Sequence, residues 1–283
     1  MLPTAMTCFL DQSWFCWRFG HSKTITIPNA QMPSFVALVM TVYNREDYLS
    51  QALDSILAQT YPHWYLTIWD DGSTDSSPEI GQHYAQLDPR ICFIQGTHAG
   101  QTPSLHGAIM TIDHYPYLAW VDSDDLLAPD ALAMTVPILD NSPQIGMVYT
   151  NHHSIDGSNR DLGLGARCQI PYSPERLLID FMTFHFRLLR REIYDQVGGI
   201  DLEFIQAQDY DICLKISEVT EIFHCLRTLY AYRVHPTMIS QLQKTQVTAC
   251  SAKAVRNALD RRDLSDQYCL NVTTDGRFKI SKI

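Results

Sequence analysis

The sequence predicts an α/β fold with a mostly parallel central sheet covered by helices on both faces. Short apolar segments alternate with segments of helical periodicity, which is typical of strand–helix–strand units. Two acidic clusters, WDDGSTDSS at 69–77 and VDSDD at 121–125, each follow an apolar segment. The chain has 283 residues, of which 46% are hydrophobic and 18% charged, so it can bury a large core.

The first strand is expected at 35–43, where FVALVMTVY forms the near-continuous apolar run of a buried parallel strand. A helix is expected to follow, because apolar residues then recur at helical spacing. They are Leu49, Ala52, Leu53, Ile56 and Leu57. Asn44 and Asp47 stand where a helix cap and its third residue belong, and Pro62 lies just beyond the end.

The alternation then continues along the chain. We expect a strand at 64–69, a helix that opens at Ser77 with Pro78 as its first residue, a strand at 91–95, a helix near 103–114 and a strand at 117–121. A single acidic cluster would more often be a solvated turn. Two clusters at the carboxyl ends of parallel strands instead favour a ligand site, because open α/β sheets bind ligands there.

Composition excludes several classes of protein. The net charge of −10, from 21 basic and 31 acidic residues, argues against nucleic-acid binding. No uninterrupted apolar stretch is long enough to span a membrane. The eight cysteines form no C-x-x-C pair, so we expect reduced thiols. The expected location is the cytoplasm, either free or peripheral at the inner face of the membrane.

Three regions are expected. Residues 1–32 are interpreted as a poorly ordered N-terminal extension, 33–240 as the main domain, and 241–283 as a C-terminal helix and hairpin appendage. The appendage has helical character at 249–260 and a hairpin pattern at 268–280 that turns at Asp275-Gly276.

The acidic cluster at 121–125 predicts a bound cation. The chain has neither the G-x-G-x-x-G nor the G-x-x-x-x-G-K-[ST] phosphate loop. Carboxylates held within ~4 Å of one another repel by roughly 4 kcal/mol at an effective dielectric constant of 20. Mg²⁺ or Mn²⁺ would relieve that repulsion, since both take oxygen ligands from carboxylates and substrate phosphates. In an extended D-x-D segment the two acids face the same side.

Five segments in order resemble the family-2 glycosyltransferases of the GT-A fold, over 35–240. They are MTVYNREDYLSQALDSILAQTY at 40–61, WDDGSTDSS, VDSDD with Pro129 after it, QDYDICLKI at 208–216 and YRVHPTMIS at 232–240. The resemblance implies a Rossmann-like nucleotide-binding half within the GT-A sheet. It also implies a nucleotide-sugar donor, with UDP as the family's commonest nucleotide, and a divalent metal, Mn²⁺ or Mg²⁺.

The same resemblance implies the donor-binding residues. They are Thr41, Tyr43, Asn44, Asp71, Asp122, Ser123 and Arg233. Tyr43 would lie near the base, and Asp71 would accept a hydrogen bond from it. The alternatives are that Tyr43 is a core aromatic at a strand end and that Arg233 is a solvated charge.

The metal ligands implied are Asp124, as the central ligand, with Asp125 and His235. Asp122 or Asp125 would hold ribose or metal from the second position, and the sequence leaves open which does which. The competing interpretations are that 122–125 only cap a helix that begins near Pro129, and that His235 is structural.

The implied general base is Asp209, in a motif where the family has Glu-Asp and this chain has Gln208-Asp209. Asp211 competes for the role. Two residues apart on a helix, the two side chains point about 200° apart, so only one can face the cleft, and the other is expected to be a surface acid or a cap. The reaction would be a single displacement that inverts the anomeric centre.

The chain lacks the Q-x-x-R-W motif of processive synthases, and its last tryptophan is Trp120. Transfer of one sugar is therefore expected, to a glycan, lipid-linked or small-molecule acceptor, with 181–199 shaping the acceptor side. Two other classes stay open: a non-catalytic relative that binds a sugar nucleotide or a partner, and a nucleotidyltransferase. The oligomeric state is left open.

Overall fold

The computed structural model describes residues 33–112, 114–238, 242–273 and 276–283. The predicted N-terminal extension at 1–32 and the predicted turn residue Asp275 lie outside the described residues.

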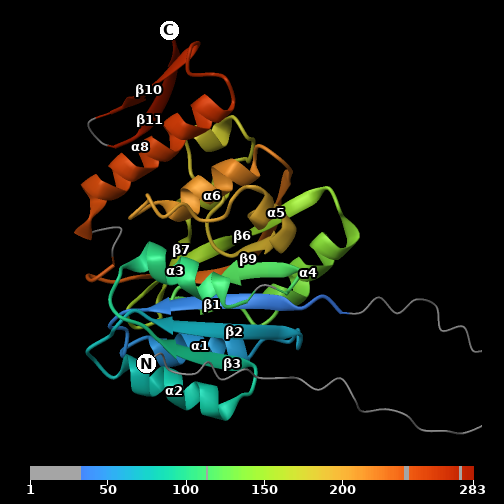
Figure 1. The fold of residues 1–283 in the computed structure, drawn as a ribbon, viewed down its shortest axis with the longest axis vertical. Coiled ribbons are helices and arrows are strands. Elements are labelled where there is room, and N and C mark those ends of the chain that lie inside the picture. The colour runs from blue at the N-terminus through green and yellow to red at the C-terminus, as the bar shows by residue number, and fades with distance from the viewer. Residues whose placement is uncertain (1–32, 113, 239–241, 274–275) are drawn as a thin grey trace, which may run out of the picture. The chain divides into compact units, whose positions relative to one another are not determined.

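The described chain forms one nine-stranded mixed sheet in the order β3-β2-β1-β4-β8-β6-β9-β5, with β7 paired to β6 (Figure 1). Its strands are β1 (Val36–Val42), β2 (Trp64–Asp70), β3 (Ile91–Gln95), β4 (Tyr117–Trp120), β5 (Leu126–Leu127), β6 (Ile145–Asp156), β7 (Asp161–Leu164), β8 (Arg187–Arg190) and β9 (Glu221–Val234). The first four strands are mutually parallel, and β8 joins them antiparallel to β4.

The chain order of these strands positions the site. From β1 the chain winds outward through β2 to β3, and then returns to place β4 on the other side of β1. In an open α/β sheet, this reversal leaves a crevice at the carboxyl ends of the two strands on either side of it. The segment that starts at Tyr43 follows β1, and VDSDD follows β4. Both motifs therefore open into one crevice.

Helices cover both faces of the sheet (Figure 1). They are α1 (Leu49–Leu57), α2 (Ser77–Leu87), α3 (Gln101–Met110), α4 (Ala131–Asn141), α5 (Arg191–Gln196), α6 (Gln208–Ile216) and α8 (Lys244–Arg261), with short 3-10 turns η1 (Ala166–Gln169) and η2 (Arg176–Leu178). Alternate residues of β1 belong to two cores: Leu38 and Met40 pack with α1 and α4, and Ala37 and Val39 pack with α3 and α6. The predicted alternation of strands and helices is confirmed.

The start of α1 differs from the prediction. The helix begins at Leu49 without a side-chain cap, and Asn44 does not cap it. Asn44 instead adopts a left-handed backbone with φ of 52°, which asparagine tolerates better than most residues. Its side-chain oxygen accepts a hydrogen bond from the Thr74 backbone N–H at 2.8 Å. Asn44 therefore ties the end of β1 to the WDDGSTDSS loop.

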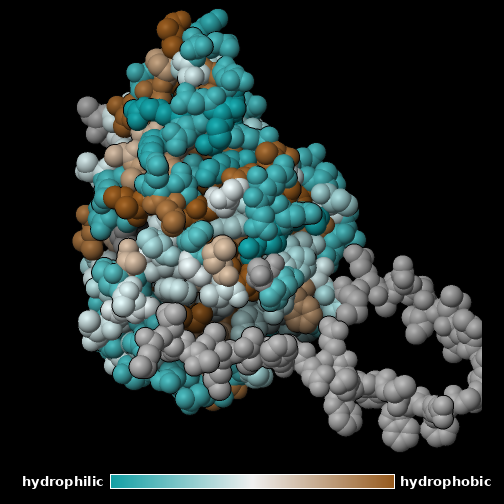
Figure 2. Space-filling view, in the orientation of Figure 1, coloured by the Kyte–Doolittle hydropathy of each residue, from teal (hydrophilic) through white to brown (hydrophobic). Residues whose placement is uncertain are grey.

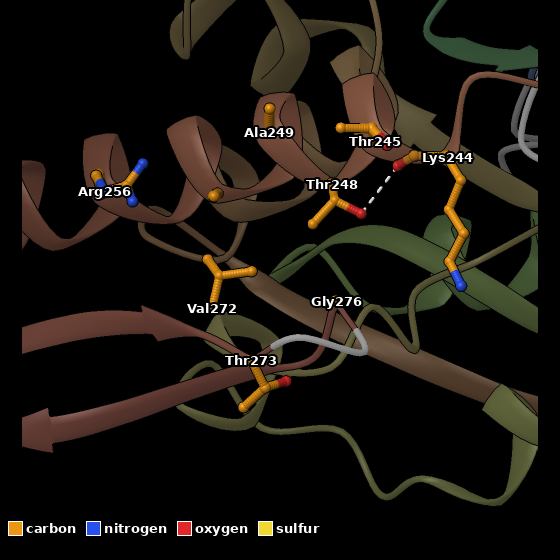
Figure 3. A pocket seen from close by; sticks show the side chains of 9 residues that line it. Lys244, Thr245, Thr248, Ala249, Arg256, Val272, Thr273 and Gly276 are labelled. Atoms are coloured by element: carbon orange, nitrogen blue, oxygen red, sulfur yellow. Dashed lines mark hydrogen bonds between the residues drawn. The ribbon is translucent and has the colours of Figure 1, made fainter.

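The C-terminal segment packs against the main domain as one helix and one hairpin. Helix α8 buries Ala254, Val255 and Ala258 in the same core as residues of α6. Its outer face is mainly hydrophilic (Figure 2). The predicted hairpin is confirmed by the antiparallel pair β10 (Tyr268–Val272) and β11 (Phe278–Lys282). A shallow pocket between α8 and the hairpin is lined by polar side chains such as Lys244 and Thr248 (Figure 3).

Within the described residues, no helix combines the length and the apolar composition that crossing a membrane requires.

Candidate active site

A cleft of about 1320 Å³ lies at the carboxyl ends of β1 and β4. All the residues predicted for the site line it, except Asp125 and His235. The helices α6 and α8 and the hairpin strand β11 line its other side, with residues such as Asp209, Val247 and Phe278. The cleft therefore joins the two predicted ends of the site, the nucleotide motifs and the candidate base.

Tyr43 lies at the rim of the cleft. Its side chain is 41% exposed, so the alternative of a core aromatic is wrong for this residue. The ring stacks on His98, with centroids 4.2 Å apart and planes 24° apart. An exposed aromatic pair of this kind offers a flat apolar surface to a planar ligand.

Asp71 is buried behind this pair and organises the loop that carries His98. Its carboxylate accepts hydrogen bonds from the backbone N–H groups of Ala99 and Gly100 at 2.7 and 3.0 Å, and from the Ser104 hydroxyl at 2.7 Å. The neighbouring Gly72 has φ of 73°, and a Cβ there would lie 2.8 Å from the His98 backbone nitrogen. The glycine lets the two loops approach closely.

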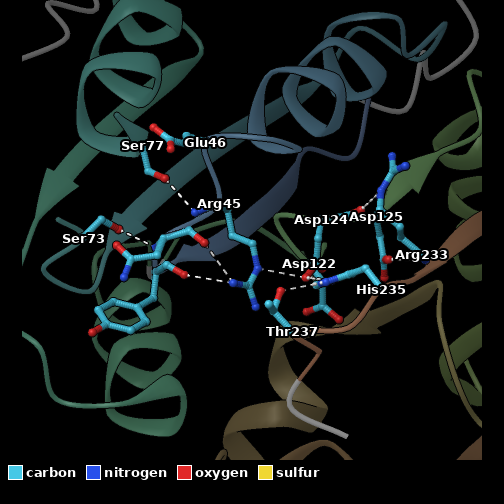
Figure 4. A network of polar contacts seen from close by, with 12 residues as sticks. Arg45, Glu46, Ser73, Ser77, Asp122, Asp124, Asp125, Arg233, His235 and Thr237 are labelled. Atoms are coloured by element: carbon cyan, nitrogen blue, oxygen red, sulfur yellow. Dashed lines mark hydrogen bonds and ion pairs between the residues drawn. The ribbon is translucent and has the colours of Figure 1, made fainter. Parts of the chain in front are cut away.

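Asp124 is the centre of a charged network (Figure 4). Its Oδ2 atom lies 2.9 Å from Arg45 Nε and 3.0 Å from His235 Nε2. The other ring nitrogen of His235 is 2.9 Å from the Thr237 hydroxyl. Arg45 also donates to the carbonyl oxygens of Tyr43 and Asn44. The carboxylate predicted to bind a metal is thus paired with one cation and one imidazole in the protein itself.

Asp125 is the predicted metal ligand that the structure turns away from the cleft. Its side chain is buried and accepts a hydrogen bond from the Arg233 backbone N–H at 2.7 Å. Burial, together with the charges of Asp124 and Asp122, holds the pKa of Asp125 well above its ordinary value. Asp125 therefore anchors the VDSDD loop to β9.

Arg233 is buried rather than solvated. Its guanidinium donates to the Asp124 backbone carbonyl at 2.6 Å, to Asn159 Oδ1 at 2.6 Å and to Gln51 Oε1 at 3.2 Å. It also lies over the Tyr48 ring at 4.8 Å. As placed, its donors brace the loop that holds Asp124, and contact with a diphosphate would require some of these bonds to break.

Asp122 is partly exposed in the cleft and is paired with His185. The His185 Nε2 atom lies 3.2 Å from Asp122 Oδ2, and its Nδ1 atom lies 3.4 Å from Arg187 Nη2. A guanidinium can only donate, so Nδ1 accepts and Nε2 carries the proton that is donated to Asp122. Burial works to raise the pKa of Asp122, but His185, Arg187 and Arg45 outweigh it and lower the pKa.

Asp209 lies in the first turn of α6 and faces the cleft. The positive end of the helix dipole favours a carboxylate there. Its Oδ2 atom is 3.3 Å from Arg187 Nη2, and the Arg187 side chain is only 1% exposed. Asp211 points elsewhere, as the helical period predicts, but it is not a surface acid. It is buried and ion-paired with Lys215 at 2.8 Å, and burial raises its pKa.

The donor chemistry of this cleft fits a divalent metal. No group of three or more His, Cys, Asp or Glu side chains converges as a metal site among the described residues. The Asp124 carboxylate and the His235 imidazole do converge, with 3.0 Å between Oδ2 and Nε2. One or two protein ligands are enough for Mg²⁺ or Mn²⁺ when substrate phosphates and water supply the rest.

Sequence reasoning missed four residues that hold the predicted ones in place. They are Arg45, His98, His185 and Arg187. Arg45 stands inside a matched motif, and His185 and Arg187 lie within 181–199, the segment expected to shape the acceptor side. No local pattern marked the pairing of His98 with Tyr43.

Comparison with known proteins places this geometry in a family. The sequence model described as Glycosyl transferase family 2 matches residues 37–198. The chain is 30% identical over 200 residues to a chondroitin synthase of Escherichia coli, in a match that covers 71% of this chain and 29% of that protein. The chain spans between 25% and 29% of the length of three curated relatives that it matches.

Two solved structures share the fold. Staphylococcus aureus TarS in complex with UDP-GlcNAc superimposes with a TM-score of 0.63 at 16% identity, over 79% of this chain and 67% of that one. The mannosyltransferase PcManGT from Pyrobaculum calidifontis, in complex with GDP-Man and Mn²⁺, gives a TM-score of 0.59 at 19% identity, over 81% and 64%. The prediction of the GT-A fold is confirmed.

Proposed function

The chain belongs to glycosyl transferase family 2, and from that premise we propose that it moves one sugar from a nucleotide-sugar donor to a hydroxyl group of an acceptor. The observation that carries the proposal is that one cleft is lined by the paired acids Asp122 and Asp124 and by the candidate base Asp209. A glycosyl transfer needs both the groups that bind the donor and the general base within reach of one anomeric carbon.

In this proposal, the nucleotide occupies the crevice beside β1. The exposed stack of Tyr43 and His98 offers a surface for the base, and Asp71 holds the loop that carries His98. Thr41, Asn44 and Ser123 line the same part of the cleft. The solved neighbours carry UDP-GlcNAc and GDP-Man respectively. A UDP-linked sugar is proposed as the donor.

Asp124 and His235 would hold a divalent metal, Mn²⁺ or Mg²⁺, with Asp122 beside them for the ribose. When bound, such an ion stabilises the negative charge that develops on the departing diphosphate. The protein's own part is to present the Asp124 carboxylate in a fixed position. Arg233 does so from behind, through its bond to the Asp124 carbonyl.

Asp209 is proposed to remove the proton from the acceptor hydroxyl while that oxygen attacks the anomeric carbon. Arg187 positions it, because the buried guanidinium holds Oδ2 at 3.3 Å and is itself held by the Thr183 carbonyl at 3.1 Å. A single displacement of this kind inverts the configuration at the anomeric carbon.

The acceptor is proposed to be a glycan, a lipid-linked sugar or a small molecule that receives one sugar. It would enter over the side of the cleft formed by Phe181, Phe184 and residues of α6 and α8. The proposed location is the cytoplasm, free or at the inner face of the membrane.

The test is a panel of nucleotide sugars incubated with the protein and Mn²⁺ or Mg²⁺, with release of nucleoside diphosphate as the readout. Asp209→Asn and Asp124→Asn serve as the disabled variants, and Asp161→Asn, whose side chain is 66% exposed, serves as the matched control. We expect metal-dependent release of nucleoside diphosphate from one donor. This release should be retained in the control and lost in both disabled variants.

Equilibrium binding of UDP and GDP separates the alternatives. Nucleotide binding without turnover, across a broad set of acceptors, would favour the non-catalytic sugar-nucleotide binder. If neither nucleotide binds with metal present, the proposed function is wrong.

A further inference from the structure

Arg167 stands apart from the charged groups described so far. It lies on η1, and its side chain lines the cleft. The guanidinium carbon lies 4.5 Å from the centre of the Phe184 ring and 5.2 Å from that of Phe181. Both distances lie within the range of cation–π contacts, which help to hold the guanidinium in the wall of the cleft. Within the described residues, its N–H groups have no hydrogen-bond or ion-pair partner.

Other arginines of the cleft are already engaged. Arg45 is paired with Asp124 at 2.9 Å, Arg187 with Asp209 at 3.3 Å, and Arg176 with Asp180. Each of these guanidinium groups therefore meets a carboxylate of the protein. Arg167 contrasts with them, because its charge is directed into the cleft and its donors remain available to a ligand.

A second polar group of the cleft also lacks a partner. Gln208 is 5% exposed, and its Oε1 atom makes no hydrogen bond within the described residues. A buried amide oxygen without a partner is costly. Gln208 directly precedes Asp209 and stands where the family pattern has glutamate. An amide at this position adds no negative charge to the cleft, which it lines together with Arg167.

The electrostatics of the cleft agree with this arrangement. Arg167 is exposed to the cleft, and the protein atoms packed around its guanidinium lower its pKa by partial desolvation. The charge of Asp209 works in the opposite direction, and that of Arg187 adds to the lowering. Because no carboxylate among the described residues is paired with it, this guanidinium gains charge-assisted hydrogen bonds, which are the strong ones, from an anionic ligand.

We propose that Arg167 recognises an acidic group on the acceptor, so that the acceptor is an acidic glycan. The inference rests on the proposed function, since it places the acceptor hydroxyl at Asp209. The planar guanidinium binds a carboxylate or a phosphate through two parallel hydrogen bonds. Gln208 Oε1 accepts a hydrogen bond from a hydroxyl group of the same sugar. The acidic group is either the carboxylate of a hexuronic acid or a phosphate ester.

The experiment uses three disaccharides that differ only at the terminal residue: glucuronic acid, glucose 6-phosphate or glucose. Each is titrated by calorimetry into the full chain with UDP and Mn²⁺ present, and each is then tested as an acceptor with the active donor. The variants are Arg167→Gln and Arg167→Lys. Arg227→Gln is the matched control, because Arg227 is 63% exposed and lies outside the cleft lining.

We expect one of the acidic disaccharides to bind at least tenfold more tightly than the neutral one, and the preferred one identifies carboxylate or phosphate. Arg167→Gln should weaken that binding about 10- to 100-fold, the loss expected for hydrogen bonds to a charged group. It should change binding of the neutral disaccharide less than about threefold. Arg167→Lys should keep part of the preference, since lysine retains the charge but loses the paired donors.

Equal binding of all three disaccharides, or an equal loss for acidic and neutral ones in Arg167→Gln, would overturn the inference. So would an equal loss in Arg227→Gln, which would point to overall charge instead of a site. UDP binding is measured in every variant. If UDP binds and the acidic preference is absent, only this inference fails; if UDP does not bind the wild-type chain, the proposed function fails with it.

Discussion

The donor and acceptor sides of the cleft differ in how their polar groups are paired. On the donor side, Asp71, Asp122 and Asp124 all have partners within the protein. On the acceptor side, Asp209 is paired with Arg187, but the Arg167 guanidinium and Gln208 Oε1 have no hydrogen-bond or ion-pair partner among the described residues.

The donor side therefore has its counter-charges in place without substrate, whereas the acceptor side does not. A network with its counter-charges built in keeps its geometry before the donor binds. Among the described residues, the acceptor side holds one exposed guanidinium and one buried amide oxygen that are free to bond a ligand. Donor recognition should therefore survive many changes on the acceptor side, whereas acceptor recognition should depend on single residues there.

The largest effect should come from Asp209→Asn, because an amide cannot accept the acceptor's proton. We expect the transfer rate to fall about 10²- to 10⁴-fold, the usual contribution of a general base. The dissociation constant of the nucleotide should stay unchanged, since within the described part of the chain the Asp209 carboxylate is bonded to Arg187 and to no residue of the donor motifs. Single-turnover rates and calorimetry with UDP measure the two quantities. An equal loss of nucleotide affinity would break the distinction between the two sides.

Protonation of the buried His152, which lies next to the acceptor side, should make the folding stability depend on pH. His152 packs against Phe184, and burial, followed by the charges of His185, Arg167 and His153, lowers its pKa from 6.5 to about 4. The unfolded chain therefore binds this proton more readily. The stability is fully present above pH 6.5 and is lost as the pH falls towards 4, by about 3 kcal/mol.

Urea unfolding of the wild type and His152→Gln between pH 7 and 4 measures this effect. The variant should lose most of the pH dependence in that window, whereas His83→Gln, which replaces an exposed histidine, should keep it. If the unfolding free energy of His152→Gln changes with pH as steeply as that of the wild type, other titratable groups cause the pH dependence.

Loss of Asp124 should affect the donor side selectively. Asp124→Asn removes the charge that we propose binds the metal. The affinity for UDP in the presence of Mn²⁺ should therefore fall at least about 10- to 100-fold, since this loss is typical even for residues that only hydrogen-bond to a metal ligand. Binding of UDP without metal should change far less. Calorimetry with and without Mn²⁺ makes the comparison, and Asp130→Asn, on an exposed ion pair, is the control. Equal losses in both conditions would argue against a metal at Asp124.

The smallest effect is expected from Arg45→Gln, which tests whether a built-in counter-charge competes with the metal. Arg45 is 2.9 Å from Asp124 Oδ2, and both side chains are partly exposed. Removing the guanidinium should tighten Mn²⁺ binding by about threefold, given the roughly 0.2 to 1 kcal/mol of such a pair. Titration of the nucleotide-free protein with Mn²⁺ measures it. Weaker Mn²⁺ binding in the variant would show that Arg45 supports the metal site.

Much of the fold and part of the candidate site follow from local patterns. Apolar runs and helical spacing located the strands from 36 to 120 and the helices between them, because burial imposes a period on each element. The helical period also separated Asp209 from Asp211 correctly, since only Asp209 lines the cleft. The predicted cap of α1 was wrong, because Asn44 turns the chain after β1 instead of capping the helix.

Local sequence patterns are enough to show which carboxylates lie at strand ends, since the order of strands and helices places VDSDD and WDDGSTDSS at one edge of the sheet. Only the tertiary structure decided what each charged group faces. It turned Asp125 towards β9, buried Arg233 behind the loop and brought Arg45, 79 residues away in the chain, onto Asp124. The physical reason is that periodicity records the environment of an element, whereas the partner of a charge is set by whichever distant loop packs beside it.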